Sequence, residues 1–333
     1  MSSGPPVLAL PGLTPALAGR LQAGLDRVDD LILDTVDHDD PLISAASAHL
    51  TEAGGKRFRP LLTLLSAELG SGVDDRVVAA AAGVELTHLA SLYHDDVMDE
   101  AQVRRGVPSV NATYGNSTAI LIGDLLFGKA SELIAGLGPE AVLIQARTFV
   151  QLCAGQIRDD QSCPAGVDPV EYYLGVLADK TGVLVGTAAR YGAMFSGGSP
   201  AQVEMMRAYG ERLGIAFQLA DDLIDITSEA AETGKTPGTD LREGVDTLGV
   251  LYARQSADPA DARLLELLGR DLHDERLHDE ALGLLRENAA MERVRATTQA
   301  VGQQATEVLA PLPDSDAKAA LLALATSVVD RVG

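Results

Sequence analysis

Residues 86–99 read LTHLASLYHDDVMD, and residues 214–225 read GIAFQLADDLID. Each stretch ends in the pattern Asp-Asp-x-x-Asp, and its apolar residues recur at the three- and four-residue spacing that is typical of an amphipathic α-helix. The aspartates of the two motifs are Asp95, Asp96 and Asp99, and Asp221, Asp222 and Asp225. Both motifs are therefore expected on helices that also carry a buried face.

Two carboxylates of each motif point the same way, because side chains four residues apart share one face of a helix. Like charges in that position cost roughly 0.2–0.5 kcal/mol per pair on an exposed helix, and burial raises the cost unless a cation neutralises them. The motifs offer only oxygen ligands, which favours magnesium or manganese over zinc. Magnesium commonly bridges carboxylates to substrate phosphates, so a diphosphate ligand is the natural expectation.

The alternative is that these aspartates are ordinary solvated residues, since the chain contains six Asp-Asp pairs. Only the pairs at 95–96 and 221–222 continue to a third aspartate three positions beyond, and only these two lie in apolar surroundings. A solvated helix face does not have this pattern. The sequence thus favours a metal site at both motifs.

The rest of the chain also has helical patterning, with 46% hydrophobic and 4% aromatic residues and few strand signals. No linker divides two cores, so we expect one domain over residues 1–333, with residues 1–12 flexible. The predicted helices cover residues 13–36, 41–52, 57–69, 74–102, 117–136, 139–159, 168–196 and 200–227, followed by shorter helices from about 246 to 331.

Composition excludes several classes of function. Lysine and arginine total 26 against 48 acidic residues, a net charge of −22, which argues against nucleic acid or an anionic membrane as the main partner. Cys153 and Cys163 lack the spacing of a zinc site or a disulfide framework. No apolar run is long enough to span a bilayer, and the first residues lack a secretory signal pattern, so a cytoplasmic location is expected.

Basic residues are few in this chain, which makes their clusters informative. Residues 54–60 read GGKRFRP, a glycine pair and three cations at the start of a helix, where backbone N–H groups and forked guanidinium donors suit a phosphate. A capped helix start with surface cations is the alternative. Arg104 and Arg105 follow the first motif, although capping of that helix alone would also explain them.

Further polar residues interrupt apolar helices. Lys180 and Thr181 lie within the helix predicted at 168–196, Gln218 precedes the second motif by three residues, and His88 precedes Asp95 by seven, on the same helix face. Each has an ordinary structural alternative, as a helix contact or a satisfied core histidine. Lys235 lies in the glycine-rich connection 228–245, which is placed to act as a lid over phosphate.

Together these segments resemble the trans-isoprenyl diphosphate synthases, also called polyprenyl synthetases, from about residue 20 to 330. The matching segments are GGKRFRP, LYHDDVMDEAQVRRGVPSVN, the Lys180-Thr181 pair, FQLADDLID and GKTPGTDL, in the family's order and spacing. The resemblance implies an all-α bundle around a deep central cavity, with the two aspartate motifs facing each other across its mouth. It also implies a homodimer, isopentenyl diphosphate and an allylic diphosphate as substrates, and two to three Mg²⁺ ions.

The resemblance also implies roles for individual residues. All six motif aspartates are candidate metal ligands, with Asp95, Asp99 and Asp221 foremost. The residues expected at the allylic diphosphate are Arg104, Lys180 and Lys235; those expected at isopentenyl diphosphate are Lys56, Arg59, His88 and Arg105; and those expected near the developing allylic cation are Thr181 and Gln218. Arg57 is a weaker candidate. The implied reaction is ionisation, condensation and elimination, with electrostatic stabilisation of the leaving diphosphate.

Two departures and two rivals qualify this interpretation. Where the family commonly has EGK followed shortly by TLP, this chain has Glu243-Gly244-Val245 and then Thr247-Leu248-Gly249, so one phosphate-binding lysine is missing. A terpene cyclase would not need the second motif or GGKRFRP, and a noncatalytic subunit would be expected to lose motif aspartates, whereas this chain keeps all six.

Product length is expected to depend on Ala90 and Ser91, which lie about 6–8 Å along the helix from Asp95. In the family, bulky aromatics there stop chain growth early. Small residues at these positions predict a long all-trans product, grown from a farnesyl or geranylgeranyl primer and suited to a quinone side chain. A geranylgeranyl or shorter product is the alternative, if residues deeper in the cavity close it.

Overall fold

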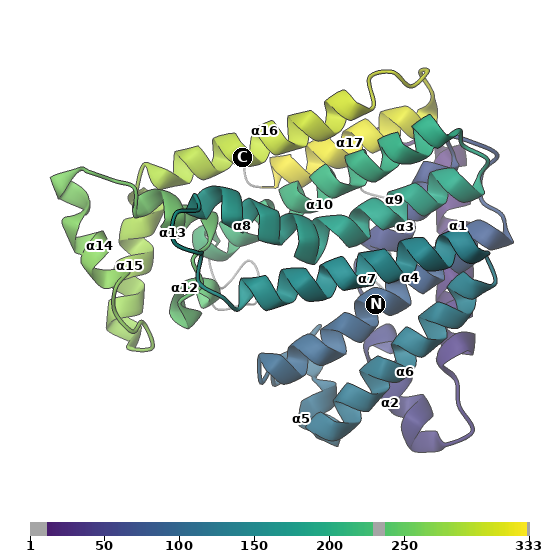
Figure 1. Ribbon diagram of the computed structural model, residues 1–333, viewed down its shortest axis with the longest axis horizontal. Coiled ribbons are helices and arrows are strands. Elements are labelled where there is room, and N and C mark those ends of the chain that lie inside the picture. Colours follow the sequence, from purple (N-terminus) through teal and green to yellow (C-terminus); the bar gives the residue numbers. More distant parts are fainter. Residues whose placement is uncertain (1–11, 229–236, 332–333) are drawn as a thin grey trace. The chain divides into compact units, whose positions relative to one another are not determined.

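The structure, a computed structural model, describes residues 12–228 and 237–331, and within these ranges the chain is almost entirely helical (Figure 1). The predicted all-α fold class is confirmed. The helices are α1 (Pro15–Val36), α2 (Pro41–Glu52), α3 (Phe58–Ala67), α4 (Asp75–Met98), α5 (Val110–Tyr114), α6 (Asn116–Ala135), α7 (Pro139–Asp159), α8 (Pro169–Leu177), α9 (Val183–Phe195), α10 (Pro200–Thr227), α12 (Thr239–Glu243), α13 (Leu248–Ala253), α14 (Ala262–Leu267), α15 (Glu275–Glu287), α16 (Ala290–Val308) and α17 (Asp316–Asp330), with a π-helical segment η2 (Ala178–Gly182) and a 3₁₀ turn η3 (Pro259–Asp261).

Local sequence chemistry sets several helix starts. Proline occupies the first turn of α1 and α2, where its missing N–H costs nothing, and the side chains of Thr14 and Asp40 accept hydrogen bonds from the first free N–H groups of these helices. Asp74 caps α4 in the same way, through the N–H of Val77. These caps explain why the predicted starts of these helices lie within two residues of the observed ones.

Two predicted helices differ from the structure. The helix predicted at 74–102 ends at Met98, because Glu100 and Arg105 adopt positive φ angles of 51° and 55° and the chain turns into a short antiparallel hairpin of β1 (Val103–Arg104) and β2 (Val107–Pro108). The helix predicted at 168–196 is divided into α8, η2 and α9. Both irregular segments carry residues predicted to bind substrate.

The described chain forms two compact units, each assembled from segments that are distant in sequence. The boundaries fall inside α7, α9, α10, α16 and α17, so the chain has no linker at these points. The single domain expected over residues 1–333 stays a prediction. The first unit comprises Met1–Val150, Leu184–Gly210 and Val308–Leu324, and the second comprises Gln151–Val183, Glu211–Glu307 and Ala325–Gly333.

In the first unit, α4 packs against α1, α3 and α6. The contact faces are lined by leucines such as Leu21, Leu64 and Leu65, all fully buried, and burial of each such side chain contributes roughly 1.5–3 kcal/mol. Gly24 of α1 lets the side chain of Leu64 approach closely, since a Cβ there would lie 3.0 Å from its Cδ1. The tight packing fixes α4, which carries the first aspartate motif.

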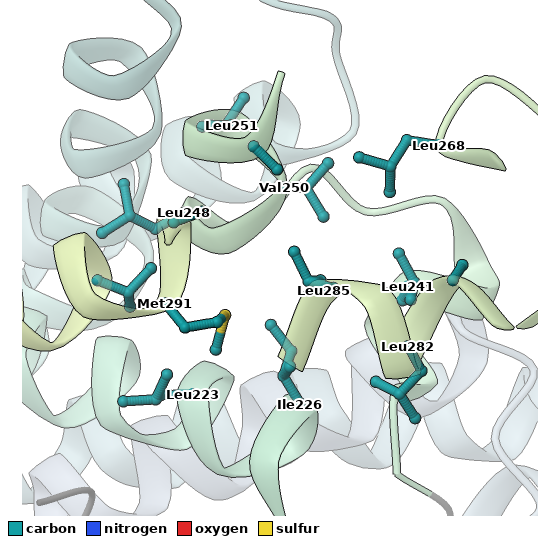
Figure 2. Close-up of a cluster of buried hydrophobic side chains, with 14 of the residues drawn as sticks. Leu223, Ile226, Leu241, Leu248, Val250, Leu251, Leu268, Leu282, Leu285 and Met291 are labelled. Atoms are coloured by element: carbon teal, nitrogen blue, oxygen red, sulfur yellow. The ribbon is translucent and has the colours of Figure 1, made fainter. Parts of the chain in front are cut away.

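In the second unit, an apolar cluster joins the end of α10 to α12, α13, α15 and α16 (Figure 2). Leu223 and Ile226 of α10 lie in this cluster with Leu282 and Leu285 of α15. The second aspartate motif is therefore anchored by its apolar neighbours, and α15 supports it. Within the described ranges, no helix is both long enough and apolar enough to cross a bilayer.

Candidate active site

The middle aspartate of the first motif points into the protein. Asp96 is fully buried, and its Oδ1 accepts a hydrogen bond of 2.6 Å from Arg104 Nε. Its main-chain carbonyl accepts another from Asn111 Nδ2 at 3.1 Å. Burial raises the pKa of Asp96, while the bond from Arg104 opposes that shift. Arg104 thus compensates a carboxylate that would otherwise be unpaired inside the protein.

The outer aspartates of this motif are more accessible. Asp95 is half-buried and Asp99, at the end of α4, has a side chain that is 61% exposed. Arg104 Nη2 lies 3.9 Å from Asp99 Oδ2, so one guanidinium contacts two aspartates of the motif. Asp95 and Asp99 are thus the more accessible carboxylates of the first motif, with Asp96 turned inward.

The hairpin after α4 places a second arginine, Arg105, against the glycine pair Gly54-Gly55. Arg105 Nη1 donates to the carbonyl of Leu50 at 2.7 Å and also to the carbonyl of Gly54. A Cβ on Gly55 would lie 2.9 Å from Arg105 Cζ, so the glycine allows the guanidinium to lie against the backbone. This contact joins the first motif's hairpin to the basic segment at 54–60, as the sequence interpretation requires.

Within the basic segment, Arg57 has a structural role. It adopts a left-handed φ of 45°, is buried, and donates to Asp29 Oδ1 at 2.7 Å, to Glu85 Oε1 at 3.1 Å and to the carbonyl of Thr51 at 3.2 Å. Its donors are committed to the protein. Its sequence-based ranking as the weaker substrate candidate agrees with these contacts.

Arg59 is different. It is half-buried, and its buried Nε atom has no hydrogen-bond partner among the described residues. Burial lowers the pKa of Arg59, but a guanidinium stays charged at neutral pH. A buried charge with an unpaired donor is costly, and an anionic ligand would satisfy both. Lys56, three residues before Arg59 in the same segment, is exposed.

His88 lies in the same positive environment. Burial, together with the nearby charges of Arg59, Arg105, Arg104 and Arg57, lowers the pKa of His88 well below its usual range. The imidazole is therefore neutral at neutral pH and can donate a hydrogen bond without adding charge. Four of the predicted substrate-binding residues thus share one neighbourhood in the first unit: Arg59, His88, Arg104 and Arg105.

The second motif repeats the inward middle aspartate. Asp222 is 7% exposed; Gln218 Nε2 donates to its Oδ1 at 2.9 Å, and the hydroxyl of Tyr173 donates to its Oδ2. Burial raises the pKa of Asp222 to about 7, against the opposing effect of these two donors. Tyr173 was not singled out from the sequence, because its contact with Asp222 joins two helices that are far apart in the chain.

The outer aspartates of the second motif have separate partners. Asp221 has a side chain that is 37% exposed and its Oδ1 lies 3.2 Å from Arg331 Nη1, near the end of α17. Asp225 accepts from the backbone N–H groups of Thr239 and Asp240, both at 3.3 Å. Asp225 therefore ties the motif to the start of α12.

The π-helical segment η2 presents Lys180 and Thr181. Lys180 Nζ lies 2.6 Å from Asp159 Oδ2 of α7, and Thr181 Oγ1 donates to Gln218 Oε1 at 3.4 Å. Gln218 in turn donates to Asp222, so a polar chain runs from η2 to the second motif. Single π-helical turns recur at functional sites in proteins, and here the turn links Thr181 to the motif through Gln218 and pairs Lys180 with α7.

The remaining predicted residues have simpler surroundings. Ala90 is fully buried and Ser91 is half-buried, with its hydroxyl donating to the carbonyl of His88 at 2.8 Å, so neither adds bulk to its helix face. Val245 is 40% exposed and supplies no cation. Lys235 lies outside the described residues.

The residues present fit a magnesium–diphosphate ligand. In the described part of the chain, no group of three or more His, Cys, Asp or Glu side chains could hold a metal ion. Magnesium does not need such a cage, because it usually keeps several waters and is bound through one or two carboxylates together with substrate phosphates. Each motif supplies two carboxylates that are less buried than the middle one, and arginines with donors suited to phosphate lie beside the first motif.

Comparison with known proteins agrees with this geometry. Residues 40–285 match the family model described as polyprenyl synthetase. The chain is 50% identical over 317 residues to the nonaprenyl diphosphate synthase of Mycobacterium tuberculosis, covering 95% of each protein.

Two solved structures also resemble it. One is a geranylgeranyl pyrophosphate synthase from Corynebacterium glutamicum complexed with calcium and isoprenyl diphosphate, at 41% identity and a TM-score of 0.87, covering 96% of this chain and 98% of that one. The other is a decaprenyl diphosphate synthase from Rhodobacter capsulatus, at 35% identity and a TM-score of 0.86, covering 96% and 99%. On these grounds, the chain belongs to the polyprenyl synthetase family.

Proposed function

We propose that this chain is a magnesium-dependent trans-prenyltransferase that adds isopentenyl diphosphate to an allylic diphosphate and forms a long all-trans-polyprenyl diphosphate. The observation that carries the proposal is the shared design of the two aspartate motifs, in which internal donors hold a buried middle carboxylate and the outer two carboxylates are less buried. Family membership and the nonaprenyl and decaprenyl products in the names of two relatives support the long-chain assignment.

Asp95 and Asp99 in the first unit and Asp221 and Asp225 in the second would hold the magnesium ions. When bound, two to three such ions would supply positive charge that neutralises the leaving diphosphate. The approach of the two motifs to one shared diphosphate is part of this proposal. Calcium in the related structure is consistent with a divalent cation at such a site.

The arginine group of the first unit would bind isopentenyl diphosphate. Arg59 Nε is buried and has no hydrogen-bond partner among the described residues. Arg105 Nη2 lies 4.0 Å from Glu85, which is too far for a hydrogen bond. Each arginine can therefore donate to phosphate oxygens. His88, neutral because of the surrounding arginines, would donate a hydrogen bond. Lys56 would add charge from the exposed side of the segment.

At the allylic substrate, Lys180, Arg104 and Lys235 would contact the diphosphate. Arg104 uses Nε for Asp96, and a guanidinium has five donors, so its Nη atoms can also serve phosphate. The oxygens of Thr181 and Gln218 would lie near the carbon that becomes positive. Gln218 donates through its nitrogen to Asp222 and accepts through its oxygen from Thr181, so the oxygens of Thr181 and Gln218 lie side by side.

The reaction then follows in three steps. The bond from the allylic carbon to oxygen breaks, and the electron pair leaves with diphosphate. The double bond of isopentenyl diphosphate attacks the allylic carbon, and a proton is lost from the adjacent carbon to form the new trans double bond. The departing diphosphate is the proposed proton acceptor. Each cycle lengthens the product by five carbons and releases one diphosphate.

A homodimer is also part of the proposal. Among the described residues, α6 and α7 carry several of the large exposed apolar side chains: Ile120, Leu121, Val142, Leu143 and Val150. The two helices are held together by the rings of Phe127 and Phe149, whose centroids lie 4.1 Å apart. Exposed apolar residues on adjoining helices are typical of a protein interface. The cytoplasmic location expected from the sequence stays a prediction.

The decisive experiment uses the purified chain with Mg²⁺, isopentenyl diphosphate and, in turn, geranyl, farnesyl and geranylgeranyl diphosphate, with mass analysis of the products. We expect products longer than geranylgeranyl diphosphate, release of diphosphate, and loss of both when Mg²⁺ is chelated. Asp221→Asn should abolish turnover, while Asp39→Asn, in an aspartate pair outside both motifs, should not. Absence of any product from the wild-type chain alone would refute the enzymatic assignment.

A further inference from the structure

We propose that helix α15 positions Asp225, through His278 and Arg286, and so adjusts how strongly the second motif binds its cation. The inference rests on the proposed function, since it assigns Asp225 to a magnesium ion. His278 and Arg286 are positioning residues in this scheme, because neither contacts the reacting groups. Neither residue belongs to the two aspartate motifs or to the basic segment at 54–60.

His278 is 2% exposed, and its Nε2 lies 2.8 Å from the carbonyl oxygen of Gly238. A carbonyl only accepts hydrogen bonds, so Nε2 donates the proton of this bond. Nδ1 is buried, has no hydrogen-bond partner among the described residues, and lies 3.6 Å from Asp279 Oδ1. Among the described residues, the bond to Gly238 is therefore the hydrogen bond that fixes the ring.

The bond from His278 holds a turn that itself holds Asp225. Gly238 has a left-handed φ of 68°, and a Cβ there would lie 2.8 Å from His278 Nε2, so only glycine allows this approach. The N–H of Gly238 donates to the main-chain carbonyl of Asp225 at 2.8 Å. The next two N–H groups, of Thr239 and Asp240, donate to the two carboxylate oxygens of Asp225.

Arg286 binds the backbone that follows Asp225. Its Nε donates to the carbonyl of Ile226, the next residue, at 2.6 Å, and its Nη2 donates to the carbonyl of Ser228 at 2.8 Å. These carbonyls lie at the end of α10, where a cation complements the helix dipole. Between the two polar contacts, Leu282 and Leu285 of α15 pack in the same apolar cluster as Ile226 (Figure 2).

The arrangement controls where the Asp225 carboxylate points. The backbone N–H groups of Thr239 and Asp240 donate one to each oxygen of the Asp225 carboxylate, so they fix its orientation. If the turn at Gly238 moves, the carboxylate loses this orientation. Groups that orient a metal ligand typically change metal affinity or activity by about 10- to 100-fold when they are removed.

The test compares His278→Gln with His278→Asn. The side-chain nitrogen of glutamine reaches about where Nε2 lies, whereas that of asparagine is too short to reach the Gly238 carbonyl. His273→Asn is the matched control, since His273 is 71% exposed and pairs only with the surface residue Asp271. Two properties are measured for each variant: hydrogen–deuterium exchange of the amides at 238–241 without ligand, and calorimetric binding of Mg²⁺ in the presence of inorganic diphosphate.

We expect His278→Asn to speed exchange at 238–241 and to weaken magnesium binding by about 10-fold, with both properties restored in His278→Gln and unchanged in His273→Asn. Unchanged exchange in His278→Asn would overturn the proposal. So would faster exchange with undiminished magnesium binding, because His278 would then serve stability alone. Failure of the wild-type chain to bind magnesium and diphosphate would instead refute the proposed function, and the exchange result would still decide whether His278 holds the turn.

Discussion

Replacing Gly155 of α7 by alanine tests whether close packing of two backbones positions Lys180 and Thr181. A Cβ at this position would lie 2.6 Å from the backbone nitrogen of Lys180 and 2.8 Å from the carbonyl carbon of Asp179. Both are backbone atoms, so neither can rotate away. Because ordinary contacts begin at 3.4 Å, η2 and α7 would have to separate by about 0.8 Å, the difference between 3.4 and 2.6 Å.

The size of the effect follows from that displacement. A misplacement of about 1 Å in a catalytic group can lower the rate about 100-fold, so we expect kcat/KM of Gly155→Ala to fall about 10- to 100-fold. Overpacking costs about 1–3 kcal/mol, partly offset by the gain of about 0.5–1 kcal/mol when alanine replaces glycine in a helix. The loss of activity should therefore exceed what the small loss of stability explains.

The assay is steady-state release of diphosphate, with the free energy of unfolding measured in urea. Gly175→Ala is the matched control: Gly175 lies inside α8 of the same unit, and no other atom lies within 4 Å of a Cβ built there. This control should keep its activity and gain slightly in stability. If Gly155→Ala keeps wild-type kcat/KM, or loses activity no more than Gly175→Ala, the positioning of Lys180 and Thr181 by this contact is refuted.

Three further predictions concern other parts of the chain. Ala90→Phe places an aromatic ring at a fully buried position of α4 and should shorten the longest product resolved by chromatography; an unchanged product distribution would contradict the role of this position in product length. Burial and nearby arginines depress the pKa of His88 in the folded chain, so as the pH falls below about 6.5 the unfolded chain takes up the proton first. The free energy of unfolding, measured in urea from pH 7 to 5, should then fall more steeply for wild type than for His88→Gln, by up to about 1.4 kcal/mol per pH unit. An equal fall in the two proteins would exclude this. Leu121→Lys, at a side chain 67% exposed, should halve the mass found by light scattering if α6 forms the dimer interface, whereas Leu42→Lys on α2, at 55% exposed, should leave it unchanged.

Much of the fold could be predicted because helical periodicity and end signals are local. Proline after Asp40 and the Asp74 cap mark helix starts that any sequence window contains. The π-helical turn at η2 could not be predicted in this way, because it depends on the approach of α7 at Gly155. The end of α4 at Met98 depends on the hairpin that follows, where Arg105 takes a left-handed conformation that is uncommon outside glycine.

The candidate site could likewise be predicted only in part from the sequence. The aspartate motifs and most of their cationic neighbours were recognisable from residue type and spacing alone. The partners of Arg57 were not, because Asp29 and Glu85 are each 28 positions away. The same holds for Tyr173 and His278, whose contacts with Asp222 and Gly238 span 49 and 40 positions. Single-sequence patterns contain no information on such pairings.

The inward turn of the middle aspartates, in contrast, follows from the helical repeat. Asp96 lies three residues after Tyr93 and seven after Leu89, both buried, so it continues the apolar face of α4. Asp222 lies three residues after Leu219 and next to Leu223, which are also buried. A carboxylate on that face needs an internal donor, and the two motifs meet this need differently: the charged Arg104 serves Asp96, and the neutral Tyr173 and Gln218 serve Asp222.

This difference has an electrostatic consequence for cation binding. Arg104 cancels one negative charge of the first motif, and it also lies 3.9 Å from Asp99. In the second motif, no cation among the described residues pairs with the middle aspartate; instead burial raises the pKa of Asp222 to about 7, which disfavours its charged form. Both routes lower the repulsion between neighbouring carboxylates that the sequence pattern creates. The outer aspartates are the less buried members of each motif, where a divalent cation would neutralise the repulsion that remains.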